Sequence, residues 1–172
     1  MSAIEHDGLL DLIDTWASLL GYYSGRIDLK SGTLSDCTTP DCTLTAHAPL
    51  WGTRKGKEVA VPVAEVRKRL SGMLRWVRIQ RHSMHLALHP EQHAASLFFE
   101  VKARTPLLPI TLGTVPLAFV VTAEETGTGL RIKHIHEWPA GTPEEAQRVL
   151  VERCGWPETT TFQPHVAFGA VS

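Results

Sequence analysis

Apolar residues recur at steps of three and four along the first part of the chain, and this spacing predicts helices. The first predicted helix covers residues 8–23, where the apolar positions form one stripe. A second covers residues 60–75, with Pro62 near its start, where proline is tolerated. Between these helices we expect a short strand at residues 42–47.

The periodicity changes from helical to alternating after Trp76, which predicts a series of strands. These predicted strands cover residues 77–89, 94–104, 112–122 and 130–138. Tight connections at residues 90–92 and 124–129 favour antiparallel pairing between consecutive strands. A last helix is predicted to begin after Thr142, a residue suited to the N-cap position.

The order of these elements, helices first and then an antiparallel meander, predicts an α+β fold. A length of 172 residues fits one domain with a sizeable core. We assign residues 1–156 to this domain and residues 157–172, which show little pattern, to a C-terminal tail. A curved sheet folded over the helices would enclose a pocket.

The composition of the chain argues against several classes of partner. The formal net charge is −1 and the basic residues are scattered, whereas nucleic-acid binding needs a concentrated basic surface. No apolar run approaches the ~20 residues of a membrane span, so we expect no membrane partner. The acidic residues 1–7 lack the layout of a signal peptide, and we expect a cytoplasmic protein. The three cysteines, an odd number, predict no disulfide framework.

Four segments of the chain resemble the NTF2-like (SnoaL-like) superfamily of conical α+β barrels. They are residues 16–25, residues 40–49, the helix at 60–75 that leads into Arg81 and His82, and residues 129–138. The last of these, GLRIKHIHEW, is similar to the family's terminal strand, which combines a glycine, spaced isoleucines, a glutamate and an aromatic residue. The nearest in kind are members from natural-product pathways: polyketide cyclases, scytalone-type dehydratases and fungal isomerases.

This resemblance implies a conical barrel in which a curved, mainly antiparallel sheet wraps over the N-terminal helices. It also implies a homodimer with one deep apolar pocket in each subunit. Chemistry in such pockets uses side-chain acids and bases, so the resemblance implies neither a metal nor an organic cofactor. The superfamily also includes non-catalytic binding and transport modules, so a binding role stays open.

Glu137 is the first candidate for acid–base chemistry, because the resemblance places the glutamate of the last strand inside the cone. A carboxyl group in an apolar cavity is harder to ionise and can exchange a proton near neutral pH. His82 shares strand parity with Met84 if the strand is regular, and it would be the acid–base partner. Tyr23, at the end of the first helix, would hold or polarise a substrate oxygen. The alternatives are an exposed glutamate paired with a lysine, and a histidine and a tyrosine that serve only the core.

Other residues would line the pocket and contact the substrate. His47, at the end of the first strand, is one of them. The apolar members of this set are Trp16, Trp51, Met84 and Phe119. Further aromatic residues are expected in the core or the pocket lining, and these are Trp76, Phe98, Phe99 and Trp138. Aromatic residues pack cores more often than they recognise ligands, but an aromatic-lined cavity would suit a rigid polycyclic substrate.

His134 and His136 stand at alternate positions of one predicted strand, so both imidazoles lie on the same face, as a metal site would require. Such a site needs further ligands at suitable spacing. Glu137 is the adjacent residue and therefore lies on the other face. We predict no metal at these histidines.

Taken together, the residues and the resemblance predict a cofactor-independent isomerase, cyclase or dehydratase that acts on a hydrophobic natural-product intermediate. The alternative is a non-catalytic module on the same fold, either a binder of small molecules or a dimeric scaffold. Glu137 and His82 in a solvent-connected cavity would favour the enzyme. A cavity filled by tryptophan and phenylalanine side chains would favour the alternative.

Overall fold

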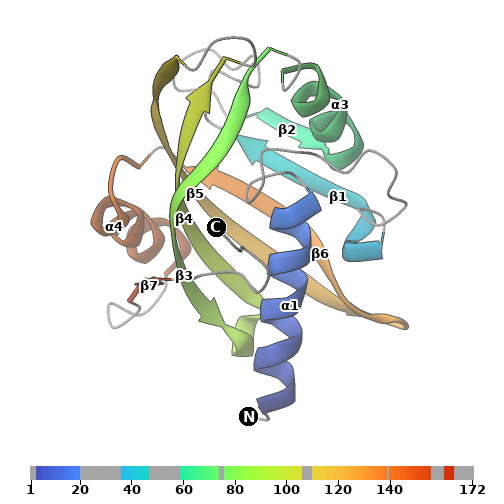
Figure 1. The fold of residues 1–172 in the computed structure, drawn as a ribbon. Helices are drawn as coiled ribbons and strands as arrows, with labels where there is room; N and C mark the ends of the chain where they lie inside the picture. The colour runs from blue at the N-terminus through green and yellow to red at the C-terminus, as the bar shows by residue number, and fades with distance from the viewer. Residues whose placement is uncertain are drawn as a thin grey trace.

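The computed structural model describes residues 3–19, 36–46, 59–73, 76–105, 110–138, 140–155 and 161–164. Within these residues one curved sheet of seven strands has the order β2-β1-β6-β5-β4-β3-β7 (Figure 1). The strands are β1 (Thr38–Ala46), β2 (Val59–Pro62), β3 (Arg78–His89), β4 (Ala94–Arg104), β5 (Thr111–Thr126), β6 (Gly129–Trp138) and β7 (Gln163–Pro164). The helices are α1 (Ala3–Leu19), α3 (Val63–Met73) and α4 (Pro143–Cys154), and a short 3-10 turn covers Pro90–Gln92.

Consecutive strands from β3 to β6 pair antiparallel, as the alternation and the tight connections predicted. The one parallel pair among the described strands joins β1 to β6, with Leu44 beside Ile135. This pair brings the first strand of the chain next to the last strand of the meander. The predicted α+β fold with a curved, mainly antiparallel sheet is therefore confirmed.

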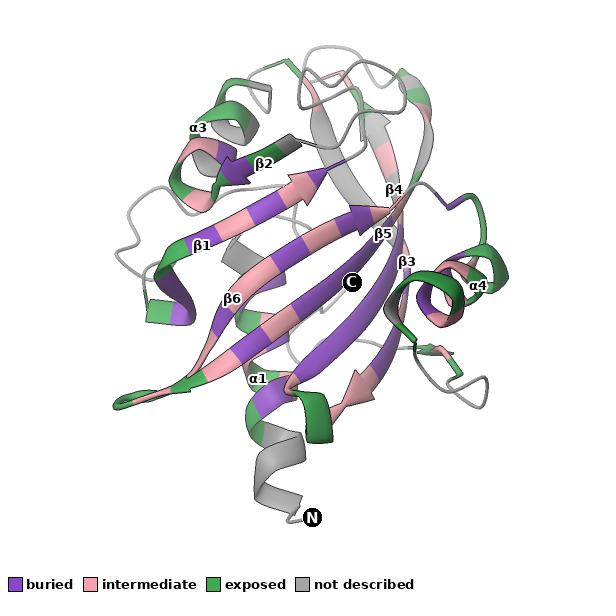
Figure 2. Cartoon of the chain, turned by 180° about the vertical axis from the view of Figure 1, so that it is seen from behind, coloured by how far each residue is buried: buried purple, intermediate pink, exposed green. Residues whose placement is uncertain are grey.

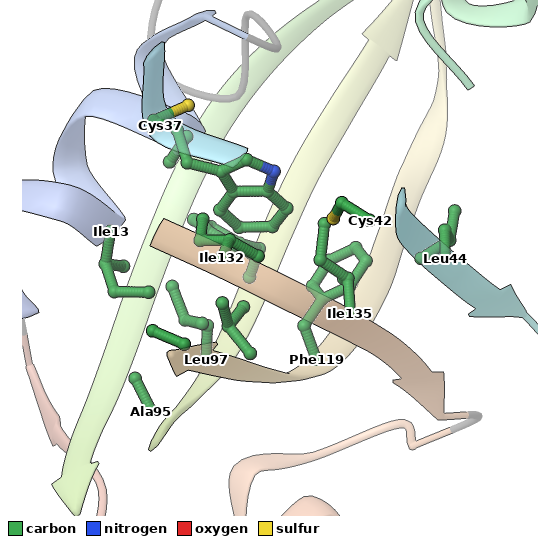
Figure 3. Packing of buried hydrophobic residues seen from close by; sticks show 14 of the residues in the cluster. Ile13, Cys37, Cys42, Leu44, Ala95, Leu97, Phe119, Ile132 and Ile135 are labelled. Carbon is green, nitrogen blue, oxygen red and sulfur yellow. The ribbon is translucent and has the colours of Figure 1, made fainter. Parts of the chain in front are cut away.

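One face of the sheet, which we call the inner face, is covered by α1 (Figure 1). Buried apolar residues of α1 pack against side chains from β4, β5 and β6 in one continuous core (Figure 3). Its largest fully buried members are Leu9, Ile13, Trp16, Leu97, Phe99, Phe119, Ile132 and Ile135. The apolar stripe seen in the sequence of the first helix is therefore the stripe that the sheet covers.

The opposite face, the outer face, has a smaller core under α4. Phe98 and Ala118 of the sheet pack there with Ala146 of α4. Thr142 caps the helix, because its hydroxyl accepts a hydrogen bond from the Glu145 backbone N–H at 3.2 Å. The predicted N-cap is confirmed, and it sets the start of α4, the helix that covers part of the outer face.

Several boundaries differ from the sequence prediction. The first strand begins at Thr38, four residues before the predicted range, so the Pro40-Asp41 pair lies inside β1. The four-residue strand β2 was not predicted, because it is short and runs directly into the apolar pattern of α3. The C-terminal tail contributes β7, which pairs with β3 at the edge of the sheet.

The aromatic residues divide into three groups. Phe99 and Phe119 lie in the inner core, whereas Phe98 and Trp138 lie on the outer face. The expectation that Trp76 belongs to the core or the pocket is wrong, because it stands before β3 and its side chain is 76% exposed. Alternation indicates the two faces of a strand, but it carries no information about a residue that precedes the strand.

Candidate functional site

Glu137 is buried on the inner face of β6. Burial alternates along the end of this strand: Ile135 and Glu137 face the inner core, and their neighbours are half-buried on the outer face (Figure 2). The side chain of Glu137 is only 4% exposed, and among the described residues it is the only buried carboxyl group. The alternative of an exposed glutamate at the strand end is therefore wrong.

Glu137 has an aromatic neighbour on the adjacent strand. Phe119 of β5 is the cross-strand partner of Glu137. The ring of Trp16 meets that of Phe119 edge-on at 5.9 Å between centroids, and Phe99 meets it at 6.0 Å. The pairing of β5 with β6 thus places Glu137 next to the aromatic part of the inner core.

His82 occupies an irregular position in β3. Arg81 pairs with Val101 and Ser83 pairs with Glu100, so the register shifts at the residue between them. A bulge of this kind breaks the alternation of faces. The regular strand that would align His82 with Met84 is therefore absent, and the side chain of His82 lies outside the described ones. Its catalytic role stays a prediction.

The remaining predicted site residues divide into two sets. Tyr23, His47 and Trp51 lie outside the described residues. The other three are buried in the inner core, and they are Trp16, Met84 and Phe119. The structure therefore brings these three and Glu137 to the same face of the sheet. The roles expected for Tyr23, His47 and Trp51 stay predictions.

The two histidines of β6 lie together on the outer face. The ring nitrogens of His134 are 3.1 Å from the Thr43 hydroxyl and 3.2 Å from the Thr45 hydroxyl. His136 stacks on Trp138, with 3.8 Å between ring centroids and an interplanar angle of 12°. Both nitrogens of His134 are thus used in hydrogen bonds between β1 and β6. This geometry gives the histidines a structural role on the outer face.

Two buried thiols belong to the inner core. Cys37 and Cys42 pack in this core near Ile132 and Ile135 (Figure 3). Burial raises the pKa of the Cys37 thiol to about 11 and that of Cys42 to about 12. Cys42 shares a face of β1 with Leu44, and this alternation was the available signal. Thiols of this kind are poor nucleophiles, so they do not compete with Glu137 as reactive groups.

A surface ion pair also escaped the sequence prediction. Lys133 of β6 donates to a carboxylate oxygen of Asp41 in β1 at 2.6 Å and lies 3.4 Å from a carboxylate oxygen of Glu124 in β5. The register between β5 and β6 shifts at Lys133, so this residue is extra in its strand. The contact connects three neighbouring strands on the outer face.

Comparisons with known proteins inform the fold. No family model and no curated protein matches the sequence. The BvnE pinacolase from Penicillium brevicompactum is similar in structure, with a TM-score of 0.54 over 90% of this chain and 96% of that one, at 10% identity. PrhC from Penicillium brasilianum matches with a TM-score of 0.52 over 87% and 92%, at 14% identity. A conserved protein from Planctomyces limnophilus matches with a TM-score of 0.54 over 81% and 100%, at 10% identity.

At these identities the likeness concerns the fold alone. The matches cover most of this chain and nearly all of each neighbour. The chain therefore has the NTF2-like fold that its sequence segments predicted.

Proposed function

We propose that this protein is a cofactor-independent acid–base enzyme that acts on an apolar small molecule, with Glu137 as the group that transfers the proton. The observation that carries the proposal is the burial of Glu137 on the inner face, at 4% exposure and beside Phe119. Burying a carboxyl group costs stability, and such costs are concentrated at functional sites.

The chemistry follows from the carboxyl group. When protonated, Glu137 could donate a proton to a carbonyl or to a departing hydroxyl group. The carboxylate left behind can then remove a proton from carbon and return the acid to its starting state. This cycle serves an isomerisation, a cyclisation or a dehydration. His82 and Tyr23 would supply the second proton-transfer group and a hydrogen bond to the substrate oxygen.

The proposal also covers the oligomeric state of the protein, the source of its substrate and its location in the cell. A homodimer, a substrate from secondary metabolism and a cytoplasmic location all rest on the resemblance to the family. The similarity in fold to a pinacolase supports the idea that this architecture can carry chemistry. No described helix has the length and apolar character that crossing a membrane requires.

The test uses a probe whose reaction needs only a base in an apolar site. In nitrobenzisoxazole a base removes the ring C–H proton while the N–O bond breaks, which releases a coloured cyanonitrophenolate. We expect wild-type protein to accelerate this reaction and Glu137→Gln to lower the rate at least about tenfold, since positioned bases contribute about a hundredfold or more.

The matched control is His136→Gln, one position earlier in β6 and on the outer face. It should retain the wild-type rate, and Glu137→Asp should retain part of it. Circular dichroism melts would show that each variant is folded. Equal rates for wild type and Glu137→Gln would overturn the assignment of the catalytic group.

One observation favours the non-catalytic alternative. Trp16, Phe99 and Phe119 are all buried, and the ring of Phe119 contacts both of the others, so they fill part of the inner face near Glu137. A protein built for passive binding would bind the probe saturably without releasing product. Equilibrium dialysis of the probe beside the rate measurement separates the two functions.

A further inference from the structure

Exposed apolar side chains gather at one end of the sheet. The large apolar residues that are exposed, among those the structure describes, are Trp76 at 76%, Ile110 at 53% and Leu112 at 57%. Trp76 precedes β3 by two residues, and the other two flank the first residue of β5. These segments meet where Arg104, at the end of β4, pairs with both strands.

We call residues 76–81, 102–105 and 110–112 the sheet tip. It lies at the end of the long strands farthest from the N-terminus (Figure 1, top). The Thr105 backbone N–H donates to the Ile110 carbonyl at 3.2 Å, which holds the start of β5 beside the end of β4. The exposed residues therefore lie at the same end of three neighbouring strands.

The sheet tip is also basic. Its segments contain no aspartate or glutamate and four basic residues, which are Arg78, Arg81, Lys102 and Arg104. The whole chain has a net charge of −1, so the rest of the chain carries −5. Basic residues that are scattered in the sequence are thus brought to one end by the pairing of the strands.

The arrangement of these charges is unfavourable for the protein alone. Arg78 lies directly opposite Arg104 in the antiparallel pair, and Lys102 follows on the same face of β4. Like charges in opposite positions destabilise a sheet. An anionic surface that contacts this end would relieve the repulsion.

We propose that the sheet tip docks on an anionic lipid surface. Trp76, Ile110 and Leu112 would enter the interfacial layer of the bilayer, where tryptophan is favoured, and the basic residues would contact lipid phosphates. No apolar run in the chain is long enough for a membrane span, but peripheral binding requires only exposed apolar and basic groups. A second copy of the chain fits less well, because a two-fold contact through this end would bring two sets of basic residues together.

The experiment is sedimentation of the full chain with phosphatidylcholine vesicles that contain or lack phosphatidylserine. We expect binding to the anionic vesicles that decreases with added salt. Arg104→Glu removes two charge units and should weaken binding about 25-fold, at about fivefold for each unit. Trp76→Ser should weaken it about tenfold through the lost apolar contact.

The matched control is Arg148→Glu, an exposed position on α4 with the same change in charge. It should alter binding less than about twofold. Equal losses in Arg148→Glu and Arg104→Glu would overturn the proposal, because net charge alone would then explain the binding. Absence of binding to any vesicle would also overturn it. So would self-association that Trp76→Ser abolishes in analytical ultracentrifugation, which would identify a second copy as the occupant.

Discussion

The two faces of β6 carry neighbouring residues that differ in their access to water and in their partners. On the inner face Glu137 is buried beside an aromatic ring. On the outer face His134 bonds to two threonine hydroxyls and His136 stacks on a tryptophan. The histidines stand out in the sequence, yet their rings make contacts within the sheet. The direction in which a side chain points is therefore a better guide to chemistry here than its type.

The largest effect should come from the inner core. Phe119→Ala removes a ring that contacts Trp16 and Phe99, and we expect it to lower the free energy of unfolding by about 3–5 kcal/mol. Val120→Ala, the next residue and on the outer face, should cost about 2 kcal/mol. Urea unfolding measures both. Equal losses would show that the two cores contribute alike.

The thiols of the inner core should be nearly unreactive. With pKa values of about 11 and 12, Cys37 and Cys42 have little thiolate at about pH 8. We expect each to react with iodoacetamide at least about a hundredfold more slowly than a free cysteine. Peptide mass spectrometry reports each cysteine separately, and unfolding in urea provides the control. Rapid labelling of either thiol in the folded protein would mean that the inner core opens to solvent.

On the outer face we expect a smaller effect that is confined to stability. His134→Ala removes two hydrogen bonds to β1, at about 1 kcal/mol each, and should destabilise the protein by about 2 kcal/mol. Thr45→Val removes only one of them and should cost about half as much. Neither variant should change the rate with nitrobenzisoxazole. If either variant reacted more slowly with nitrobenzisoxazole while its stability was unchanged, the catalytic group would lie on the outer face instead.

The fold was predictable where one periodicity acts alone. Apolar and polar residues alternate over residues 99–104, and the strand predicted at 94–104 has the same bounds as β4. The start of β1 was missed because Pro40 and Asp41 are typical of turns, although here they extend the strand before it pairs regularly with β6. The short β2 was missed because its apolar residues continue into those of α3.

The candidate site was predictable in part. The side of β6 that Glu137 occupies was expected from the resemblance to the family, and the buried Ile135 two residues earlier lies on the same side. The position of His82 does not follow, because a bulge interrupts β3 at that residue and no sequence pattern marks it. Phe119 becomes a neighbour of Glu137 only through the register of β5 on β6. Registers depend on packing across strands, which a single sequence does not display.

The smallest effect should come from the ion pair on the outer face. The hydrogen bond from Lys133 holds the pKa of Asp41 below its usual 3.8, and the same contact holds the pKa of Lys133 above its usual 10.5. The ionised Asp41 therefore adds stability above about pH 4, and this contribution is lost as the pH falls through its lowered pKa. The stability that the charged Lys133 adds is lost only as the pH rises through its raised pKa. Both groups are exposed to solvent and salt, so these contributions are small.

The melting temperature of the wild type should fall as the pH is lowered, and Asp41→Asn should make this fall smaller. The control is Glu152→Gln, which removes another exposed carboxylate, on α4. Thermal melts across the acid range measure the difference. A decline that Asp41→Asn leaves unchanged would place the acid-sensitive group elsewhere in the chain. The buried Glu137 on the inner face would then be the first residue to test.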